Sequence, residues 1–246
     1  MPRRTYRRNF LAMKRTFAVV GTVLACLIFF AFHIAQTSWR VSSSSRTPAV
    51  ERPKVFPRKV WQTWQGSKKL EDEPLRLART WVELNPGYGY ELLTDSTAET
   101  YIRRAFPNDV DLLDTWAKIN DYILRADLIR YLAMLGDGGI YSDMDTDCTR
   151  PIVDWLPREL EEAADIVVGI EYDERADPLR EDMSEAAQFC TWTIMAKPGS
   201  RHMQNVVDDT LNKLRAATRN ESIHADNATE VLRLTGPRVS GGVRPH

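Results

Sequence analysis

The pattern of apolar and polar positions predicts an α/β domain over residues 58–246. Short runs with β-branched or aromatic residues predict strands at 59–63, 88–93, 140–141, 165–170 and 188–196, with 165–170 buried. Apolar residues at helical spacing predict helices at 73–84, 96–106, 109–119, 122–135 and 200–219. Because strands and helices alternate in the first half of this region, we expect a layered domain with a mostly parallel sheet.

An uninterrupted apolar run precedes this domain. Residues 17–35 carry no formal charge except at His33, and as a helix they would span about 28 Å, close to the thickness of the bilayer interior. Residues 1–15 hold six basic and no acidic side chains, so residues 1–16 are expected to stay cytoplasmic. The sequence thus predicts an uncleaved single-pass anchor, with a cleaved signal peptide as the alternative.

Residues 36–57 are rich in serine and proline. Such a composition cannot bury enough apolar surface to form a core. We interpret this segment as a flexible stem between the membrane anchor and the domain at 58–246.

The apolar helix predicted at 122–135 contains two charged side chains at i, i+3 spacing, Asp127 and Arg130. Charges in a buried helix are costly unless they are paired or used for binding. Two interpretations follow, a structural ion pair and a ligand-binding pair, and the spacing alone does not separate them.

Three aspartates follow the predicted strand at 140–141. Glycines at 136, 138 and 139 permit a tight reversal before it, and Asp143, Asp145 and Asp147 then occupy alternate positions. In an extended segment, residues i and i+2 point to the same side, so Asp143 and Asp145 would present their carboxylates together. A hard divalent cation, Mn²⁺ or Mg²⁺, would relieve their repulsion. The alternative interpretation is a solvated acidic turn.

Five stretches, in this order and spacing, resemble one family. They are FPRKVWQTWQ at 56–65, WVELNPGYGYELLTD at 81–95, RADLIRYLAMLGDGGIYSDMDTDCTRPI at 125–152, QFCTWTIMAKPGS at 188–200 and VLRLTGP at 231–237. They are similar to the DXD-containing glycosyltransferases of family 32, and within it to the fungal Golgi initiation-specific α-1,6-mannosyltransferases.

The resemblance implies a fold, a reaction and a location. The fold would be GT-A, a Rossmann-like nucleotide-sugar-binding architecture. The enzyme would be a retaining hexosyltransferase that uses GDP-mannose and Mn²⁺ or Mg²⁺ to extend a glycan acceptor, by α-1,6 transfer to N-glycan cores. It would be a type II Golgi membrane protein with a lumenal catalytic domain. The alternatives are transfer to a sphingolipid headgroup, and a weak or inactive lumenal subunit of a mannosyltransferase complex.

The resemblance also assigns residues. Asp143 would contact the sugar donor or the metal, and Asp145 would bind the metal, so both count as catalytic. Asp127, Arg130 and Tyr131 match positions that bind the donor. The equivalent of WQTW helps to form the nucleotide pocket, so a final set of residues would border the base, with core aromatics as the alternative: Gln62, Thr63 and Trp64.

Charge and cysteine content narrow the picture. Outside residues 1–15 the chain has 27 basic and 34 acidic side chains, about −7, which argues against nucleic acid as a partner. Cys148 and Cys190 would either pair in an oxidising lumen or remain as two buried thiols. Sequons at Asn220 and Asn227 are candidate N-glycosylation sites in a lumenal domain.

The last residues, 239–246, do not resemble the family. Its members continue past the TGP motif with a His and a Ser-Trp region that help to close the donor and metal site. The resemblance therefore implies a domain that is incomplete at its C-terminus.

Overall fold

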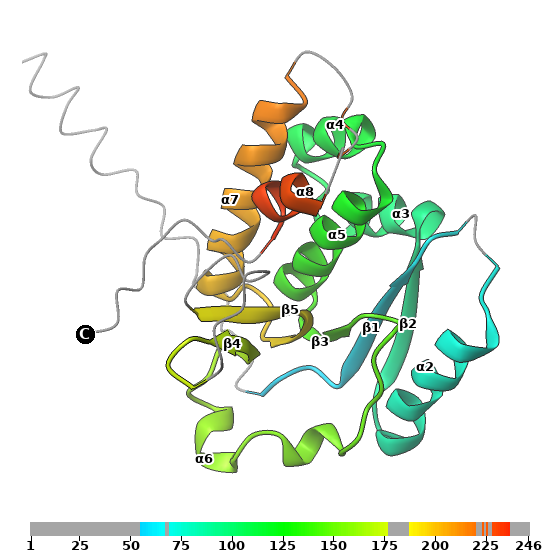
Figure 1. The fold of residues 1–246 in the computed structure, drawn as a ribbon, viewed down its shortest axis with the longest axis vertical. Helices are drawn as coiled ribbons and strands as arrows, with labels where there is room; N and C mark the ends of the chain where they lie inside the picture. The colour runs from blue at the N-terminus through cyan, green and yellow to red at the C-terminus, as the bar shows by residue number, and fades with distance from the viewer. Residues whose placement is uncertain are drawn as a thin grey trace, which may run out of the picture. The chain divides into compact units, whose positions relative to one another are not determined.

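The centre of the fold is a five-stranded sheet with the strand order β2-β1-β3-β5-β4 (Figure 1). The computed structural model describes residues 55–66, 69–176, 187–219, 223, 225 and 228–236. The strands are β1 (Lys59–Trp64), β2 (Gly89–Thr94), β3 (Gly139–Ser142), β4 (Ile166–Asp173) and β5 (Ala187–Ala196). All five predicted strands are therefore present, with ends shifted by up to three residues.

The helices also match the prediction closely. Five of them were expected, and three short segments were not: the 3-10 turn Ile152–Asp154, α6 (Arg158–Glu161) and α8 (Ala228–Leu234). The expected helices are α2 (Asp72–Leu84), α3 (Asp95–Ala105), α4 (Val110–Lys118), α5 (Tyr122–Gly136) and α7 (Arg201–Ala217).

The predicted membrane anchor at 17–35 and the stem up to residue 54 lie outside the described residues. Within the described part of the chain, no helix combines the length and the apolar character that a bilayer crossing requires.

The sheet is mixed, where the sequence predicted a mostly parallel one. β1 pairs in parallel with both β2 and β3, as expected. β5 runs antiparallel to both of its neighbours, β3 and β4. Because β4 and β5 are consecutive strands, they pair as an antiparallel hairpin, and β5 enters the sheet between β3 and β4.

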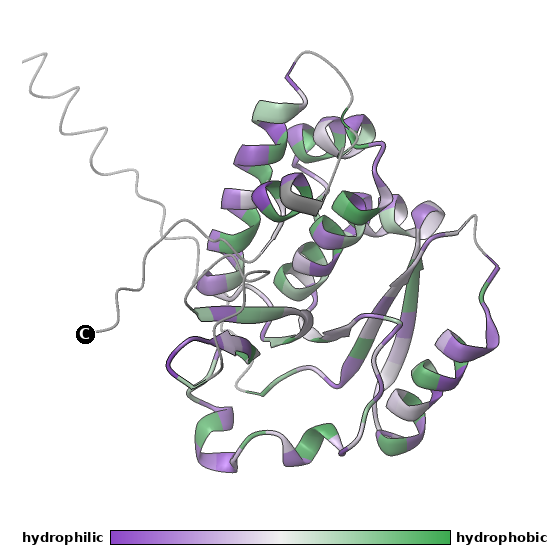
Figure 2. Ribbon diagram, viewed as in Figure 1, coloured by the Kyte–Doolittle hydropathy of each residue, from purple (hydrophilic) through white to green (hydrophobic). Residues whose placement is uncertain are grey.

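Alternation along the strands divides the core between the two faces of the sheet. Trp61 and Tyr141 face α3, α4, α5 and α7 and belong to the larger apolar cluster. Their neighbours Val60 and Ile140 point to the opposite face, where they join a smaller cluster with Trp81 of α2. Figure 2 shows that α7 carries both hydrophilic and hydrophobic residues, as expected for a helix with one exposed and one buried side.

The α5 helix is the most deeply buried of these helices. Asp121 caps its N-terminus by accepting hydrogen bonds from the backbone N–H groups of Ile123 (2.8 Å) and Leu124 (3.2 Å). From Leu128 to Leu135 every residue is buried, because α5 packs against the sheet on one side and α7 on the other. Its C-terminal end leads through Gly138 and Gly139 directly into β3.

The strand predicted to be buried at 165–170 lies at the edge of the sheet. Most of β4 is only partly buried, and Ile170 is 66% exposed. The prediction was wrong because an apolar run of this length does not show whether a strand has one neighbour or two. The strand continues through Glu171 to Asp173, three residues beyond its predicted end.

The reversal between α5 and β3 generates the first prediction. Gly139 has a φ of 104°, and a Cβ atom there would lie 2.5 Å from the Lys59 carbonyl oxygen. Gly139→Ala should therefore lower the free energy of unfolding by about 2–3 kcal/mol. Urea denaturation followed by tryptophan fluorescence would measure the change.

Gly87→Ala is the matched control. A Cβ atom at Gly87 would meet only the Arg58 side chain, at 4.0 Å, and its φ is not positive. The control should change stability by less than about 1 kcal/mol. Equal stability of the two variants would contradict the close approach of β3 to β1.

Candidate functional site

The turn after β3 carries the paired aspartates. The backbone N–H of Thr146 donates to the carbonyl of Asp143 (3.2 Å), and the Thr146 hydroxyl donates to the same oxygen (2.6 Å). Asp143 and Asp145 therefore lie in a turn, where the sequence analysis expected an extended segment. The turn nevertheless brings both residues to the wall of one cleft.

The carboxylate of Asp143 is held from two sides. The Tyr141 hydroxyl donates to its Oδ1 atom (2.6 Å), and the Arg130 Nη2 atom lies 3.4 Å from the same oxygen. Thr63 makes a hydrogen bond to the Tyr141 hydroxyl (2.9 Å). The guanidinium of Arg130 also stacks over the Tyr141 ring, 5.0 Å from its centroid. Three elements thus fix one carboxylate at the end of β3.

The Asp127–Arg130 pair lies behind Asp143. The Arg130 Nη2 atom is 2.7 Å from Asp127 Oδ1, and both side chains are about nine-tenths buried. Thr235 donates from its hydroxyl to the other Asp127 oxygen (2.5 Å), and Arg130 Nη1 donates to the Thr191 carbonyl (2.9 Å). The structural ion pair therefore exists, and the contact of either residue with a sugar donor stays a prediction.

Burial and charge oppose each other in this network. Burial alone would lower the pKa of Arg130, but Tyr141, Asp127 and Asp143 raise it, so the guanidinium stays charged. Burial raises the pKa of Asp143, while Arg130 and the Tyr141 hydrogen bond lower it and Asp145 raises it again. A cation at the paired aspartates would offset both effects that disfavour the Asp143 carboxylate, its burial and the negative charge of Asp145.

Two residues assigned to the donor site are buried inside the protein. Gln62 donates to the Asp143 carbonyl (3.1 Å) and accepts a hydrogen bond from Tyr90 (2.7 Å). Tyr131 donates to the carbonyl of Thr235 (2.9 Å). Both side chains support the turn and α5 from within, and their contact with a ligand stays a prediction.

The cleft beside the turn has a volume of about 280 Å³. Thr63 and Trp64, predicted to border a base, lie in its wall. Sequence analysis did not identify several other lining residues, which come from α3, α4 and α5. These add aromatic rings, a cation and a third carboxylate: Trp116, Tyr122, Arg125 and Asp95.

These residues were missed because each also has an ordinary structural explanation. Trp116 packs in the larger core cluster, and Arg125 lies over its ring (5.2 Å) and donates to the Ile119 carbonyl (2.6 Å). Asp95 caps the backbone N–H of Gly66 (3.0 Å). One signal in the sequence could have pointed to Arg125 as a site residue: it lies in the same family-like stretch, 125–152, as Arg130.

Gln65 adds an unused polar atom at this cleft. Its side-chain Oε1 atom is buried and has no hydrogen-bond partner among the described residues. A buried acceptor without a partner is costly, so a ligand that donates a hydrogen bond here would be favoured.

The carboxylate oxygens of the turn suit a divalent cation that is also coordinated by a bound ligand. No group of three or more His, Cys, Asp or Glu side chains with metal-binding geometry occurs in the described residues. Asp143 has one oxygen engaged with Tyr141 and Arg130, and Asp145 is exposed. Mn²⁺ or Mg²⁺ held by two carboxylates usually completes its octahedron with phosphate oxygens and water.

The remaining predicted residues are separate from this cleft. Asp147 is exposed and faces α2, where its charge adds to the larger effect of Glu73 in raising the pKa of Arg76. Cys148 and Cys190 are both free, so the alternative of two unpaired thiols holds, although Cys190 is only half-buried. Asn220 and Asn227 lie outside the described residues.

Comparison with known proteins shows what the chain resembles. Residues 72–161, which include α5, β3 and the turn with both aspartates, match the family described as "Glycosyltransferase sugar-binding region containing DXD motif". This match confirms the resemblance found in the sequence.

Two of the similar proteins are fungal mannosyltransferases. The chain is 28% identical over 205 residues to the initiation-specific alpha-1,6-mannosyltransferase of Candida albicans, covering 77% of this chain and 52% of that protein. It is 30% identical over 191 residues to the Schizosaccharomyces pombe protein of the same name, covering 75% and 46%. The chain thus spans about half the length of these relatives.

One solved structure supports the fold. The PaToxG glycosyltransferase superimposes with a TM-score of 0.50 at 18% identity, covering 76% of this chain and 68% of that one. The predicted GT-A-like glycosyltransferase architecture is therefore confirmed, with the mixed sheet described above.

The buried ion pair generates the second prediction. Arg130→Ala leaves the Asp127 carboxylate buried without its cation, so the free energy of unfolding should fall by about 3–5 kcal/mol. Urea denaturation would measure the loss.

Arg103→Ala provides the comparison. Arg103 pairs with Glu99 on the exposed surface of α3 (2.6 Å), so its removal should cost less than about 1 kcal/mol. If both variants lost the same small amount, the pair at Arg130 would not be stabilising α5.

Proposed function

We propose that this protein is a retaining glycosyltransferase that transfers mannose from GDP-mannose to a glycan acceptor. The finer assignment is α-1,6 transfer to N-glycan cores. Its support is the match to the DXD family together with the names of the two fungal relatives quoted above.

The observation that carries the proposal is the convergence of the DXD carboxylates and an aromatic cleft. Asp143 and Asp145 lie at the carboxyl end of β3, where α/β sheets commonly bind nucleotides. The same cleft is walled by Trp64 and Trp116 and includes the guanidinium of Arg125. A planar base, a diphosphate and a sugar need this combination of ring, charge and carboxylate.

The side chains divide the work of binding the sugar donor. The aromatic wall would stack the base, and Gln65 would accept a hydrogen bond from one of its N–H groups. Asp143 and Asp145 would hold Mn²⁺ or Mg²⁺, which when bound stabilises the charge of the departing diphosphate. Tyr141 and Arg130 keep the Asp143 carboxylate in place before the ligand arrives.

Retention of configuration is the proposed stereochemical course. The acceptor oxygen would attack the anomeric carbon from the face that the diphosphate leaves. The α-linked donor then gives an α-linked product, and the proton of the acceptor hydroxyl goes to the departing diphosphate.

We place the enzyme in the Golgi membrane as a single-pass type II protein. Residues 17–35 would anchor it and the domain would be lumenal, where Asn220 and Asn227 could be glycosylated. A mannosyltransferase complex would be its partner there.

A sphingolipid headgroup is the second candidate acceptor. The mannosyl phosphorylinositol ceramide synthase SUR1 of Saccharomyces cerevisiae is 34% identical to this chain over 107 residues. That match covers 42% of this chain and 26% of the relative, so it supports the sugar-transfer region more than the choice of acceptor.

Asp145 generates the third prediction. Its side chain is exposed, so Asp145→Asn should leave the stability unchanged while reducing Mn²⁺-dependent hydrolysis of GDP-mannose by about 100-fold or more, because the cation loses a charged ligand. The measurement is GDP release from the purified 246-residue chain, with and without EDTA.

Asp111→Asn removes one exposed carboxylate from α4, away from the cleft, and serves as the control. It should hydrolyse GDP-mannose at the wild-type rate. Wild-type protein with no metal-dependent GDP release would favour the inactive subunit, and an Asp145→Asn variant with full activity would remove the metal assignment.

A further inference from the structure

A second cleft lies directly after the DXD turn. Its volume is about 410 Å³, and its walls come from α2, residues 147–150, the segment around Trp155, and β5. We propose that this cleft binds a neutral hexose unit of the acceptor. The inference rests on the proposed function, since it assigns the second substrate of that reaction.

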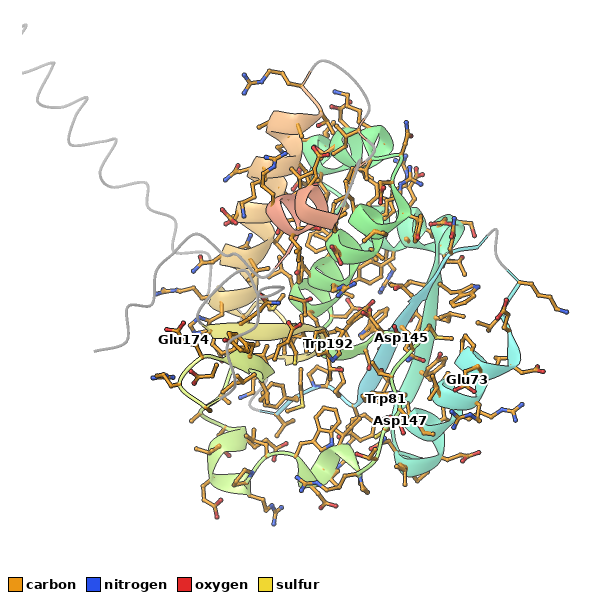
Figure 3. All side chains as sticks on the ribbon, in the orientation of Figure 1. Glu73, Trp81, Asp145, Asp147, Glu174 and Trp192 are labelled. Atoms are coloured by element: carbon orange, nitrogen blue, oxygen red, sulfur yellow. The ribbon has the colours of Figure 1, made fainter. Side chains whose placement is uncertain are left out.

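The two clefts are connected by one loop. Asp143 and Asp145 line the cleft assigned to the sugar donor, and Asp147 lines the second one. The side chain of Thr193 in β5 lines the second cleft and also bonds the Ser142 hydroxyl (3.2 Å), which leads into the turn. In Figure 3, Asp145 and Asp147 of this loop are labelled close to Trp81 of α2. A sugar in the second cleft would therefore lie next to the site of transfer.

Trp155 forms the apolar wall of the second cleft, and the buried Trp81 supports it from behind. The rings of Trp81 and Trp155 meet edge to face, 5.8 Å apart and at 76°. The Trp81 Nε1 atom donates to the Thr146 carbonyl (3.1 Å), and the Trp155 Nε1 atom donates to the Arg150 carbonyl (3.0 Å). Both rings are thus fixed in orientation, and Trp155 is only partly buried. A preorganised indole suits the apolar C–H face of a pyranose ring.

Polar groups surround this apolar wall. Asp147 and Thr149 are both exposed at the cleft, so a carboxylate and a hydroxyl are open to sugar hydroxyl groups. One aromatic wall with a few convergent polar groups is the usual composition of a small-ligand site.

The charged side chains of the cleft balance one another, which suits a neutral sugar. The carboxylate of Asp147 would repel a phosphate group in the same space. Arg150 lines the same cleft and donates from Nη2 to the Asp154 carbonyl, so the lining carries one negative and one positive side chain. A hexose hydroxyl, by contrast, can donate a charge-assisted hydrogen bond to Asp147.

Binding of methyl α-mannopyranoside to the 246-residue chain tests the proposal. The wild-type chain should show saturable binding in a calorimetric or NMR titration, with no sugar donor present. Asp147→Asn should raise the dissociation constant by about tenfold, because a charge-assisted hydrogen bond is lost. Trp155→Ala should raise it by at least a similar factor, and Asp111→Asn should leave it unchanged.

The outcomes separate this inference from the proposed function. Mannoside binding that weakens in Asp147→Asn supports the cleft, even in a chain that releases no GDP from GDP-mannose. Donor turnover without mannoside binding overturns the cleft and leaves the transferase standing. Unchanged affinity in Asp147→Asn, or tighter binding of inositol 1-phosphate than of the mannoside, overturns the inference as well.

Discussion

The site depends on a single buried cation, the guanidinium of Arg130. It contacts Asp127 within α5, lies over the ring of Tyr141 in β3, and reaches the carboxylate of Asp143 in the following turn. Removing water from these charges is costly, and their close mutual contact, together with the hydrogen bonds from Thr235 and to the Thr191 carbonyl, offsets that cost. One side chain therefore joins helix, strand and turn, and the position of the DXD turn follows from the packing of α5.

Most of the fold could be predicted from local patterns, because the strands and helices are marked by clear apolar periods. The direction and exposure of the last two strands, β4 and β5, could not be predicted, because the apolar content of a strand does not show whether it is central or at an edge. At the site, Asp143 and Asp145 could be predicted because two neighbouring carboxylates repel each other unless a cation lies between them. Trp116 and Arg125 could not be predicted as site residues, because an aromatic residue in a core helix and an arginine near the start of a helix are common in proteins without any binding role. Only the tertiary structure brings them to the turn.

The loop from Asp143 to Arg150 organises both clefts. Its first residues are fixed by Tyr141, Arg130 and Gln62, and its later backbone carbonyls receive the indole N–H groups of Trp81 and Trp155. A short, rigid segment with a ligand surface on each side is suited to holding two substrates in one orientation, because positioning supplies much of the advantage of catalysis. The geometry of transfer would then depend little on mobile side chains.

The hydrogen bond from Thr235 to Asp127 joins residues that are 108 positions apart in the sequence. Contacts between such distant positions are slow to form, because closing the long intervening loop costs conformational entropy. During synthesis the ribosome must release residue 235 before the carboxylate of Asp127 acquires this partner. The emerging polypeptide can therefore build α5 and the sheet well before its charged centre is complete.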